Sequence, residues 1–401
     1  TDFETLDSRD RAFVRMLVTT TLRRLGQVDD LIARASERKQ RPSPPVLEMI
    51  LRLGVVQLIF MDVPAHAAVN TTVELAATRK LGSRKGFINA VLRRIGRDGK
   101  DWTTRQDIPR LNTPDWLLTR WIDTYGLSTT LEIAMANMAE PPLDITLKDN
   151  ESRDDWAQKL GATPLAEGSL RLNTSGGDVT RLPGYEAGAW WVQDAAAAIP
   201  ARLFGDIQGA HVIDLCAAPG GKTAQLAAAG AHVTAIERSA RRNRQLQANL
   251  QRLSLEGYVT CTAADAAVWQ PEGKADFVLL DAPCTATGTL RRHPEIAWLR
   301  GQPDVDKLAA TQAHLLDNAL NMLAPGGVLI YATCSLQPEE GEDQIVRLLA
   351  ENADIKRWPI DTAGGVPEGA ITQDGDARIL PCHLSAHGGM DGFFIARLVK
   401  S

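Results

Sequence analysis

The 401-residue sequence lacks the features of several protein classes, and each absence narrows the possibilities. Its five cysteines form an odd number and include no Cys-x-x-Cys pair, which argues against a disulfide framework or a zinc ribbon. No apolar run reaches about 18 residues, so we expect no membrane span. The charged segment 1–10 contains no signal-peptide core. We therefore expect a cytoplasmic protein that has no metal site.

Two common phosphate-binding motifs are also absent from the glycine turn Asp214-Leu-Cys-Ala-Ala-Pro-Gly-Gly-Lys-Thr223. A P-loop requires glycine at position 216, where this chain has cysteine, and the dinucleotide fingerprint G-x-G-x-x-G does not occur. The turn follows an apolar strand ending at 211–213 and precedes an alanine-rich helix expected at 223–229. Because the first N–H groups of a helix lack intrahelical partners, this turn can receive a carboxylate.

The net charge of −5 conceals an uneven distribution of charge along the chain. Residues 1–130 carry 21 basic and 15 acidic side chains, a balance of +6, whereas the remainder has a balance of −11. A basic part joined to an acidic part suggests that the basic part meets a polyanion. A solvated helical surface explains the same charge equally well, so charge alone leaves both interpretations open.

The basic part is predicted to form an all-helical domain over residues 1–127, with helices between 8 and about 125. One helix face is formed by apolar residues and one glycine at the spacing of successive helical turns, namely Leu47, Ile50, Leu51, Gly54, Val55 and Leu58. Basic residues gather around a later helix, expected at 87–95. Of these, Arg93, Arg94 and Arg97 are our candidates for binding RNA phosphates.

The remainder of the chain changes pattern twice. Residues 128–189 read as a small α+β subdomain, because 143–147 alternates like a strand, a helical segment follows, and 169–172 is a further possible strand. From 190 to 401, strands alternate with helices, which predicts a doubly wound, Rossmann-like parallel sheet. Ligands of such sheets bind beyond the carboxyl ends of the strands. The chain is therefore expected to be multidomain.

Carboxylates stand at two of these strand ends. Glu237 ends the second strand, where it can accept both ribose hydroxyls, and Asp265 ends the third, where it can hold an adenine amino group. Together they favour an adenosine cofactor without a phosphate requirement, and S-adenosylmethionine fits, with S-adenosylhomocysteine as its product. The full set of expected cofactor-binding residues is Cys216, Ala217, Ala218, Pro219, Gly220, Gly221, Lys222, Glu237, Asp265 and Asp281.

Two cysteines, Cys284 and Cys334, stand at the ends of the fourth and fifth strands. Methylation of a pyrimidine at C5 is difficult because that carbon is a poor nucleophile. A thiolate that adds at C6 converts the ring to an enamine whose C5 can attack a sulfonium methyl group. A base must then remove the C5 proton so that the thiolate can leave. A single cysteine is most often buried packing, but a pair at neighbouring strand ends suits this chemistry.

Five segments carry a resemblance to the RNA 5-methylcytosine methyltransferases, a class I S-adenosylmethionine-dependent group. They are Asp214-Leu-Cys-Ala-Ala-Pro-Gly-Gly-Lys222, Asp281-Ala-Pro-Cys284, Arg291-Arg-His-Pro294, Tyr331-Ala-Thr-Cys-Ser335 and Met390-Asp-Gly-Phe-Phe394. Over residues 8–97, the segments 52–58, 63–70 and 86–93 resemble the NusB-type RNA-binding domain. The chain as a whole is similar to the RsmB (Fmu/Sun) family, in which the 128–189 region is a small RNA-recognition-like subdomain.

The resemblance implies a role for several residues. It makes Cys334 the nucleophile, lets Cys284 assist proton removal and enzyme release, and places Asp281 at the N3/N4 edge of cytosine. It also implies 5-methylcytosine formation in 16S rRNA, at cytosine 967. From their position after the Cys284 loop, we expect Arg291, Arg292 and His293 to contact RNA phosphates.

The expected partner is therefore RNA, as 16S rRNA or a partially assembled small subunit, bound by a monomer. Two alternatives remain open at this point. One is a NusB-like RNA-binding or assembly protein without catalysis, and the other is a tRNA cytosine-C5 methyltransferase.

Overall fold

The computed structural model describes residues 3–36, 42–149, 152–166, 168–173 and 177–401. The chain forms two compact units: one consists of Thr1–Met138 with His293–Leu299, and the other of Ala139–Arg292 with Arg300–Ser401. Among the described residues, no helix combines the length and the apolarity that crossing a membrane requires. In the same residues, no cluster of three or more His, Cys, Asp or Glu side chains could hold a metal ion.

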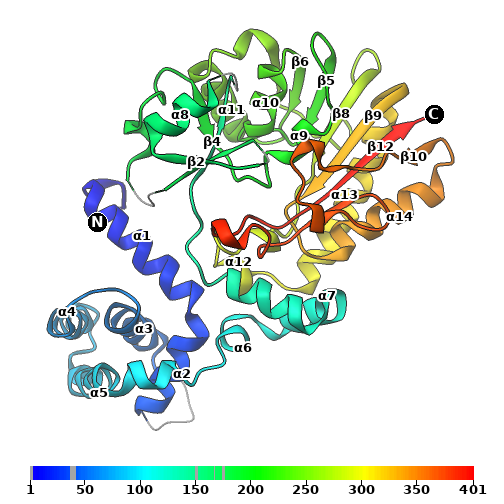
Figure 1. Cartoon of the computed structure of the whole chain (residues 1–401). Coiled ribbons are helices and arrows are strands. Elements are labelled where there is room, and N and C mark those ends of the chain that lie inside the picture. The colour runs from blue at the N-terminus through cyan, green and yellow to red at the C-terminus, as the bar shows by residue number, and fades with distance from the viewer. Residues whose placement is uncertain (1–2, 37–41, 150–151, 167, 174–176) are drawn as a thin grey trace. The chain divides into compact units, whose positions relative to one another are not determined.

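The first unit is helical, as its sequence predicts (Figure 1). Its helices are α1 (Ser8–Arg23), α2 (Leu25–Ser36), α3 (Pro45–Ile59), α4 (Ala65–Thr78), α5 (Lys85–Thr103), α6 (Ile108–Asn112), α7 (Asp115–Ala136) and the short α12 (Ile296–Leu299). The predicted face of α3 lies in the core, where Leu47, Leu51 and Val55 are at most 2% exposed. The basic helix α5 is longer at both ends than the predicted span 87–95.

The expected boundary at 127/128 falls inside α7, which continues to Ala136. Gly126 interrupts this helix with a φ of 77°, a backbone conformation that glycine adopts without a steric penalty. The first passage of the chain from one unit to the other lies at Met138/Ala139, beyond the expected boundary. The helix is therefore interrupted close to the expected boundary. The residues between this interruption and Met138 nevertheless belong to the first unit.

The second unit contains a small antiparallel sheet of order β2-β3-β1-β4. Its strands are β1 (Asp144–Leu147), β2 (Ala162–Pro164), β3 (Leu170–Leu172) and β4 (Trp190–Val192), with α8 (Arg153–Leu160) packed on the sheet. The small sheet extends beyond residue 189, the predicted end of the α+β subdomain, because Trp190, Trp191 and Val192 pair with β1.

The large sheet has the order β10-β12-β9-β8-β5-β6-β7, and β11 pairs with β12. Its strands are β5 (His211–Leu215), β6 (His232–Ile236), β7 (Val259–Thr262), β8 (Ala275–Asp281), β9 (Leu323–Thr333), β10 (Ile355–Arg357), β11 (Ala377–Ile379) and β12 (Phe393–Lys400). The five strands from β9 to β7 are parallel. The predicted Rossmann-like fold is confirmed, and its parallel sheet has an antiparallel edge, because β12 runs antiparallel to β9 and to β10.

The central strands of the large sheet are covered on both faces, which explains why they are largely apolar, whereas the edge strands β7 and β10 carry polar residues. One core contains residues of α9 (Ile199–Arg202), α10 (Gly221–Ala228) and α11 (Ala240–Arg252), and the other contains residues of α13 (Gln302–Met322) and α14 (Glu342–Glu351). Along β9, Val328 and Ile330 face the first core, whereas Leu329 and Tyr331 face the second. The chain order reverses between β5 and β8, the point at which ligands bind in sheets of this kind.

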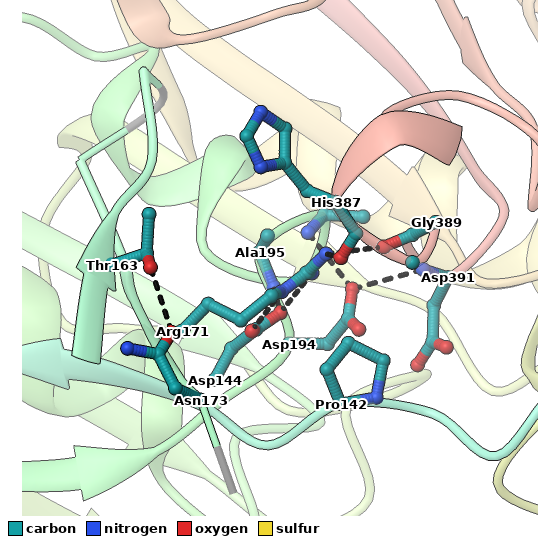
Figure 2. A network of polar contacts seen from close by, with 12 residues as sticks. Pro142, Asp144, Thr163, Arg171, Asn173, Asp194, Ala195, His387, Gly389 and Asp391 are labelled. Carbon is teal, nitrogen blue, oxygen red and sulfur yellow. Dashed lines mark hydrogen bonds and ion pairs between the residues drawn. The ribbon is translucent and has the colours of Figure 1, made fainter. Parts of the chain in front are cut away.

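A buried ion pair of the small sheet also binds the loop that leads into β12 of the large sheet (Figure 2). Arg171 of β3 donates two bonds of 2.7 Å to Asp144 of β1, and both side chains are at most 5% exposed. The same guanidinium donates to the carbonyl groups of His387 and Gly389, in the loop that precedes β12. Asp144 also accepts a bond of 3.1 Å from the backbone N–H of Ala195.

We predict that Asp144→Ala lowers the free energy of unfolding of the second unit by about 3–5 kcal/mol, because it leaves the Arg171 cation buried without its counter-ion. Urea denaturation followed by tryptophan fluorescence measures the change. Glu351→Ala, which removes one of the two carboxylates that pair with Arg347 at the surface, is the control and is expected to cost less than about 1 kcal/mol. Equal effects of the two substitutions would contradict the prediction.

Candidate active site

The glycine turn connects β5 to α10 at the carboxyl edge of the large sheet. Gly220 is the N-cap residue of α10 and has a φ of 105°, and a Cβ at this position would lie 2.5 Å from Leu246 Cδ1. Cys216 also has a left-handed backbone, with a φ of 64°. This backbone path explains the motif, because it leaves the N–H groups at the start of α10 directed out of the turn.

Asp214, the first residue of the glycine turn, was not among the predicted site residues. Asp214 is 1% exposed, and burial raises the pKa of this carboxyl to about 7. Thr223 of α10 donates a bond of 2.6 Å to Asp214 Oδ2, which fixes the helix to the strand. Asp214 Oδ1 is buried without a hydrogen-bond partner within the described residues. A buried acceptor of this kind marks a place where a ligand donor can bind.

Lys222 and Asp281 form an ion pair between the glycine turn and the end of β8. The Nζ atom of Lys222 lies 2.7 Å from Asp281 Oδ2, and Lys222 is only 9% exposed. Its ammonium group also lies 5.2 Å from the centroid of the Phe393 ring. Because β5 and β8 border the point where the chain order reverses, this pair stands where a ligand is expected.

Glu237 and Asp265 follow the neighbouring strands β6 and β7, as predicted. Glu237 is 3% exposed and accepts a bond of 2.8 Å from the backbone N–H of Ser239. Its Oε2 atom lies 3.1 Å from Arg242 Nη1 but makes no hydrogen bond of good geometry. The Asp265 side chain is 42% exposed and accepts from the N–H of Ala267. Each carboxylate therefore keeps one oxygen that a ligand hydroxyl or amino group can use.

The two predicted cysteines lie in contact, with 3.5 Å between their Sγ atoms. They follow β8 and β9, which pair in parallel so that Asp281 lies opposite Ala332. Both residues are partly exposed, and neither forms a disulfide. The hydrogen bond to Cys334 and the burial of the sulfur raise the pKa of Cys284 well above its ordinary value. Cys284 therefore keeps its proton more firmly than an ordinary thiol does.

The expected phosphate contacts of Arg291 and Arg292 are corrected by the structure. Arg291 is fully buried, and its Nη2 atom lies 3.9 Å from Asp194 and 3.7 Å from Asp391. Arg292 donates to the same two carboxylates at 2.6 and 3.0 Å, and its side chain is 22% exposed. Because Asp194 and Asp391 are buried, their negative charges need cations beside them, and the two arginines supply these positive charges. His293, by contrast, is exposed and lies 3.2 Å from Glu295.

The three arginines predicted to bind phosphates on α5 differ in their surroundings. Arg93 and Arg97 are exposed, although Arg97 pairs with Asp98 at 2.9 Å. Arg94 is half-buried, donates to the carbonyl of Ala35 and lies over the ring of Trp102. The helix therefore presents two of the three guanidinium groups to solvent.

Comparison with known proteins gives a family match for the helical N-terminal part and another for the part that contains the large sheet. The family described as 16S rRNA methyltransferase RsmB/F matches residues 205–399, and the NusB family matches residues 1–97. Ribosomal RNA small subunit methyltransferase B of Erwinia tasmaniensis is 36% identical to this chain, over 99% of the chain and 92% of that protein. The chain belongs to the RsmB/F family of rRNA methyltransferases.

A further relative belongs to the same family, and solved structures share the fold of this chain. The methyltransferase B of Shewanella oneidensis is 34% identical, over 98% of this chain and 91% of that protein. The crystal structure of PH0851 has a TM-score of 0.79 and 23% identity and covers 99% of this chain and 91% of that protein, which shows a shared fold. A methyltransferase homolog from Pyrococcus horikoshii has a TM-score of 0.59 and 27% identity, covering 71% of this chain and 94% of that protein.

We predict that iodoacetamide modifies Cys284 and Cys216 slowly at neutral pH. Burial raises the pKa of Cys216 to about 12, and Cys284 is held in its thiol form as described above. Peptide mass spectrometry over a range of pH gives the modification rate of each cysteine, with glutathione as the reference thiol. Modification of Cys284 at pH 7 as fast as that of glutathione would contradict the described environment.

Proposed function

We propose that this RsmB/F protein transfers a methyl group from S-adenosylmethionine to C5 of a cytosine in 16S rRNA. The observation that carries the proposal is the contact between the sulfurs of Cys284 and Cys334 at the carboxyl edge of the sheet. A packed core does not require two thiols at two adjacent strand ends, whereas addition to C6 needs a nucleophile and removal of the C5 proton needs a base, and a pair of thiols suits these two roles. The membership of the rRNA methyltransferase family favours rRNA over tRNA as the substrate.

The residues at the sheet edge fit the proposed cofactor. Glu237 offers a buried oxygen for ribose hydroxyls, Asp265 offers an exposed one for an adenine amino group, and the N-terminus of α10 can receive a carboxylate. Lys222 and residues 216–221 line the same turn, and the unpartnered Oδ1 of Asp214 adds an acceptor for the amino group. When bound, the cofactor supplies an electrophilic methyl group.

The division of labour between the cysteines is the one that the family resemblance implies. The attack on C6 is assigned to Cys334, and the raised pKa of Cys284, which is hydrogen-bonded to Cys334, supports a different role for Cys284. Asp281, at the end of β8, is proposed to contact the N3/N4 edge of the base, and Lys222 holds its carboxylate in place. Removal of the C5 proton is assigned to Cys284, whose thiolate is a strong base because its pKa is raised.

We also propose that RNA phosphates bind at α5 of the helical unit, through Arg93 and Arg97 with a smaller part for the half-buried Arg94. His293 is a further candidate, since it is exposed. These groups would position the RNA rather than select the cytosine. Cytosine 967 and the form of the substrate, 16S rRNA or a partial subunit, remain part of the proposal.

The two cysteines can be tested by substitution with alanine. Cys334→Ala cannot form the C6 adduct and is expected to lose all methyl transfer while it still binds cofactor and RNA. Cys284→Ala is expected to attack and to transfer the methyl group, but then to stall as a protein–RNA conjugate because the C5 proton is not removed. A denaturing gel with labelled rRNA should show a slow band for Cys284→Ala alone. The reverse pattern would exchange the two roles, and active variants without a band would exclude covalent catalysis.

We expect Glu237→Ala and Asp265→Ala each to raise the dissociation constant for S-adenosylmethionine. The loss of a hydrogen bond to a charged group costs about 1.5–3 kcal/mol, which corresponds to roughly ten- to a hundredfold weaker binding. Isothermal titration calorimetry measures the effect, and Glu272→Ala, an exposed carboxylate beyond β7, is the control. Unchanged binding by both variants would remove these residues from the proposed site.

A further inference from the structure

Glu340 is a buried carboxylate that lies behind both cysteine turns. It belongs to the short helix Pro338–Glu340 after β9 and has no exposed surface. Its Oε1 atom accepts a hydrogen bond of 2.9 Å from the backbone N–H of Thr285. Its Oε2 atom accepts one hydrogen bond from the hydroxyl of Thr285 and another, of 2.5 Å, from the hydroxyl of Ser335. Thr285 directly follows Cys284, and Ser335 directly follows Cys334. One side chain therefore holds both turns.

The backbone of Glu340 and its neighbour Gln312 strengthen the same connection. The carbonyl of Glu340 accepts from the hydroxyls of Tyr331 and Thr333, at 2.8 and 3.2 Å, before the Cys334 turn. The side-chain amide of Gln312, on α13, donates a hydrogen bond of 3.1 Å to Glu340 Oε1 and one of 2.9 Å to the carbonyl of Pro283, the residue before Cys284. Each cysteine is therefore fixed through the residues on both of its sides.

The four donors around the side chain match an ionised carboxylate. The N–H of Thr285 and the amide N–H of Gln312 can only donate to it, while the two hydroxyls can donate or accept. Burial raises the pKa of Glu340, and the hydrogen bonds from Ser335, Thr285 and Gln312 oppose this rise. A buried negative charge beside two thiols disfavours a second negative charge there.

Other ionisable groups near the cysteines do not replace this effect. The negative charge of Glu340 contributes to the raised pKa of Cys284, after the hydrogen bond to Cys334, burial and the charge of Cys334. Tyr331 is fully buried, and burial raises the pKa of its hydroxyl well above the ordinary value, so it remains neutral. Arg378, which donates to the carbonyl of Ser335, forms its own ion pair with Glu342.

We propose that Glu340 is a positioning residue that holds the two cysteine sulfurs together and, through its charge, makes Cys284 a stronger base for the release of the methylated RNA. This inference rests on the proposed function. In the release step, the C5 proton moves to the Cys284 thiolate, and the electrons of the C5–H bond form the C5–C6 double bond. The C6–S bond breaks, and its electron pair returns to Cys334. Cys284 must lose its own proton to water beforehand, so release should accelerate as the pH rises.

The first experiment measures thiol modification alone, without RNA or cofactor. Glu340→Gln keeps the shape of the side chain and its ability to hydrogen-bond but removes the charge. In this variant we expect the pH midpoint for iodoacetamide modification of Cys284 to fall by about one pH unit. The control is Glu339→Gln, the same change at the neighbouring residue, whose side chain lies 3.4 Å from Gln302, and this variant should keep the wild-type midpoint.

The second experiment follows the breakdown of a protein–RNA adduct formed at low pH and then transferred to a series of higher pH values. Glu340→Gln is expected to shift the pH profile of breakdown downwards by the same amount as in the first experiment. Glu340→Asp keeps the charge but not the length, so its profile should stay at the wild-type position while its maximal rate falls.

Two outcomes would overturn the role of Glu340. One is a folded Glu340→Gln protein with the wild-type midpoint, and the other is a Glu340→Asp profile that shifts as far as that of Glu340→Gln. A shifted midpoint, together with the absence of an adduct at every pH in both the wild-type protein and Cys284→Ala, would support the effect of Glu340 on the thiol and instead overturn covalent catalysis. The two levels of the proposal can therefore fail separately.

Discussion

The parallel pairing of β8 with β9 is the constraint on which the cysteine site depends. This pairing brings Asp281 opposite Ala332, so the segments that follow the two strands leave the sheet at the same edge and in register. The sulfurs of Cys284 and Cys334 then reach contact distance although the residues are 50 positions apart in the sequence. A shift of one residue in this register would turn the side chains of one strand to the opposite face of the sheet. Strand pairing in the core therefore decides the chemistry at the surface.

Much of the site could be predicted because its signals are local. The glycine turn, the carboxylates after β6 and β7, and both cysteines are each recognised from a strand and the few residues that follow it. The parallel order of such strands then places their ends along one edge without further information. For the same reason, the apolar face of α3 follows from the spacing of its own residues.

The predictions that were wrong or incomplete depended on partners far away in the sequence. Arg291 and Arg292 appear in the sequence as exposed basic residues after a catalytic loop, but their carboxylate partners Asp194 and Asp391 are about 100 residues distant on either side. The antiparallel direction of β12 likewise depends on its pairing with β9, a strand that lies far earlier in the sequence. Glu340 was missed because it follows another glutamate, Glu339, in a short polar segment, and nothing in that segment indicates that its side chain is buried.

The charged network around Arg171 also bears on how this protein could be recombined with its relatives. Asp144 and Arg171 belong to the small sheet, yet they bind the backbone at Ala195, His387 and Gly389. Arg292 adds a bond to the carbonyl of Pro142. A chimaera cut near residue 190 would combine charges and acceptors that come from different parents. Residues 139–292 and 300–401 form one compact unit, and their exchange together keeps these contacts within one parent.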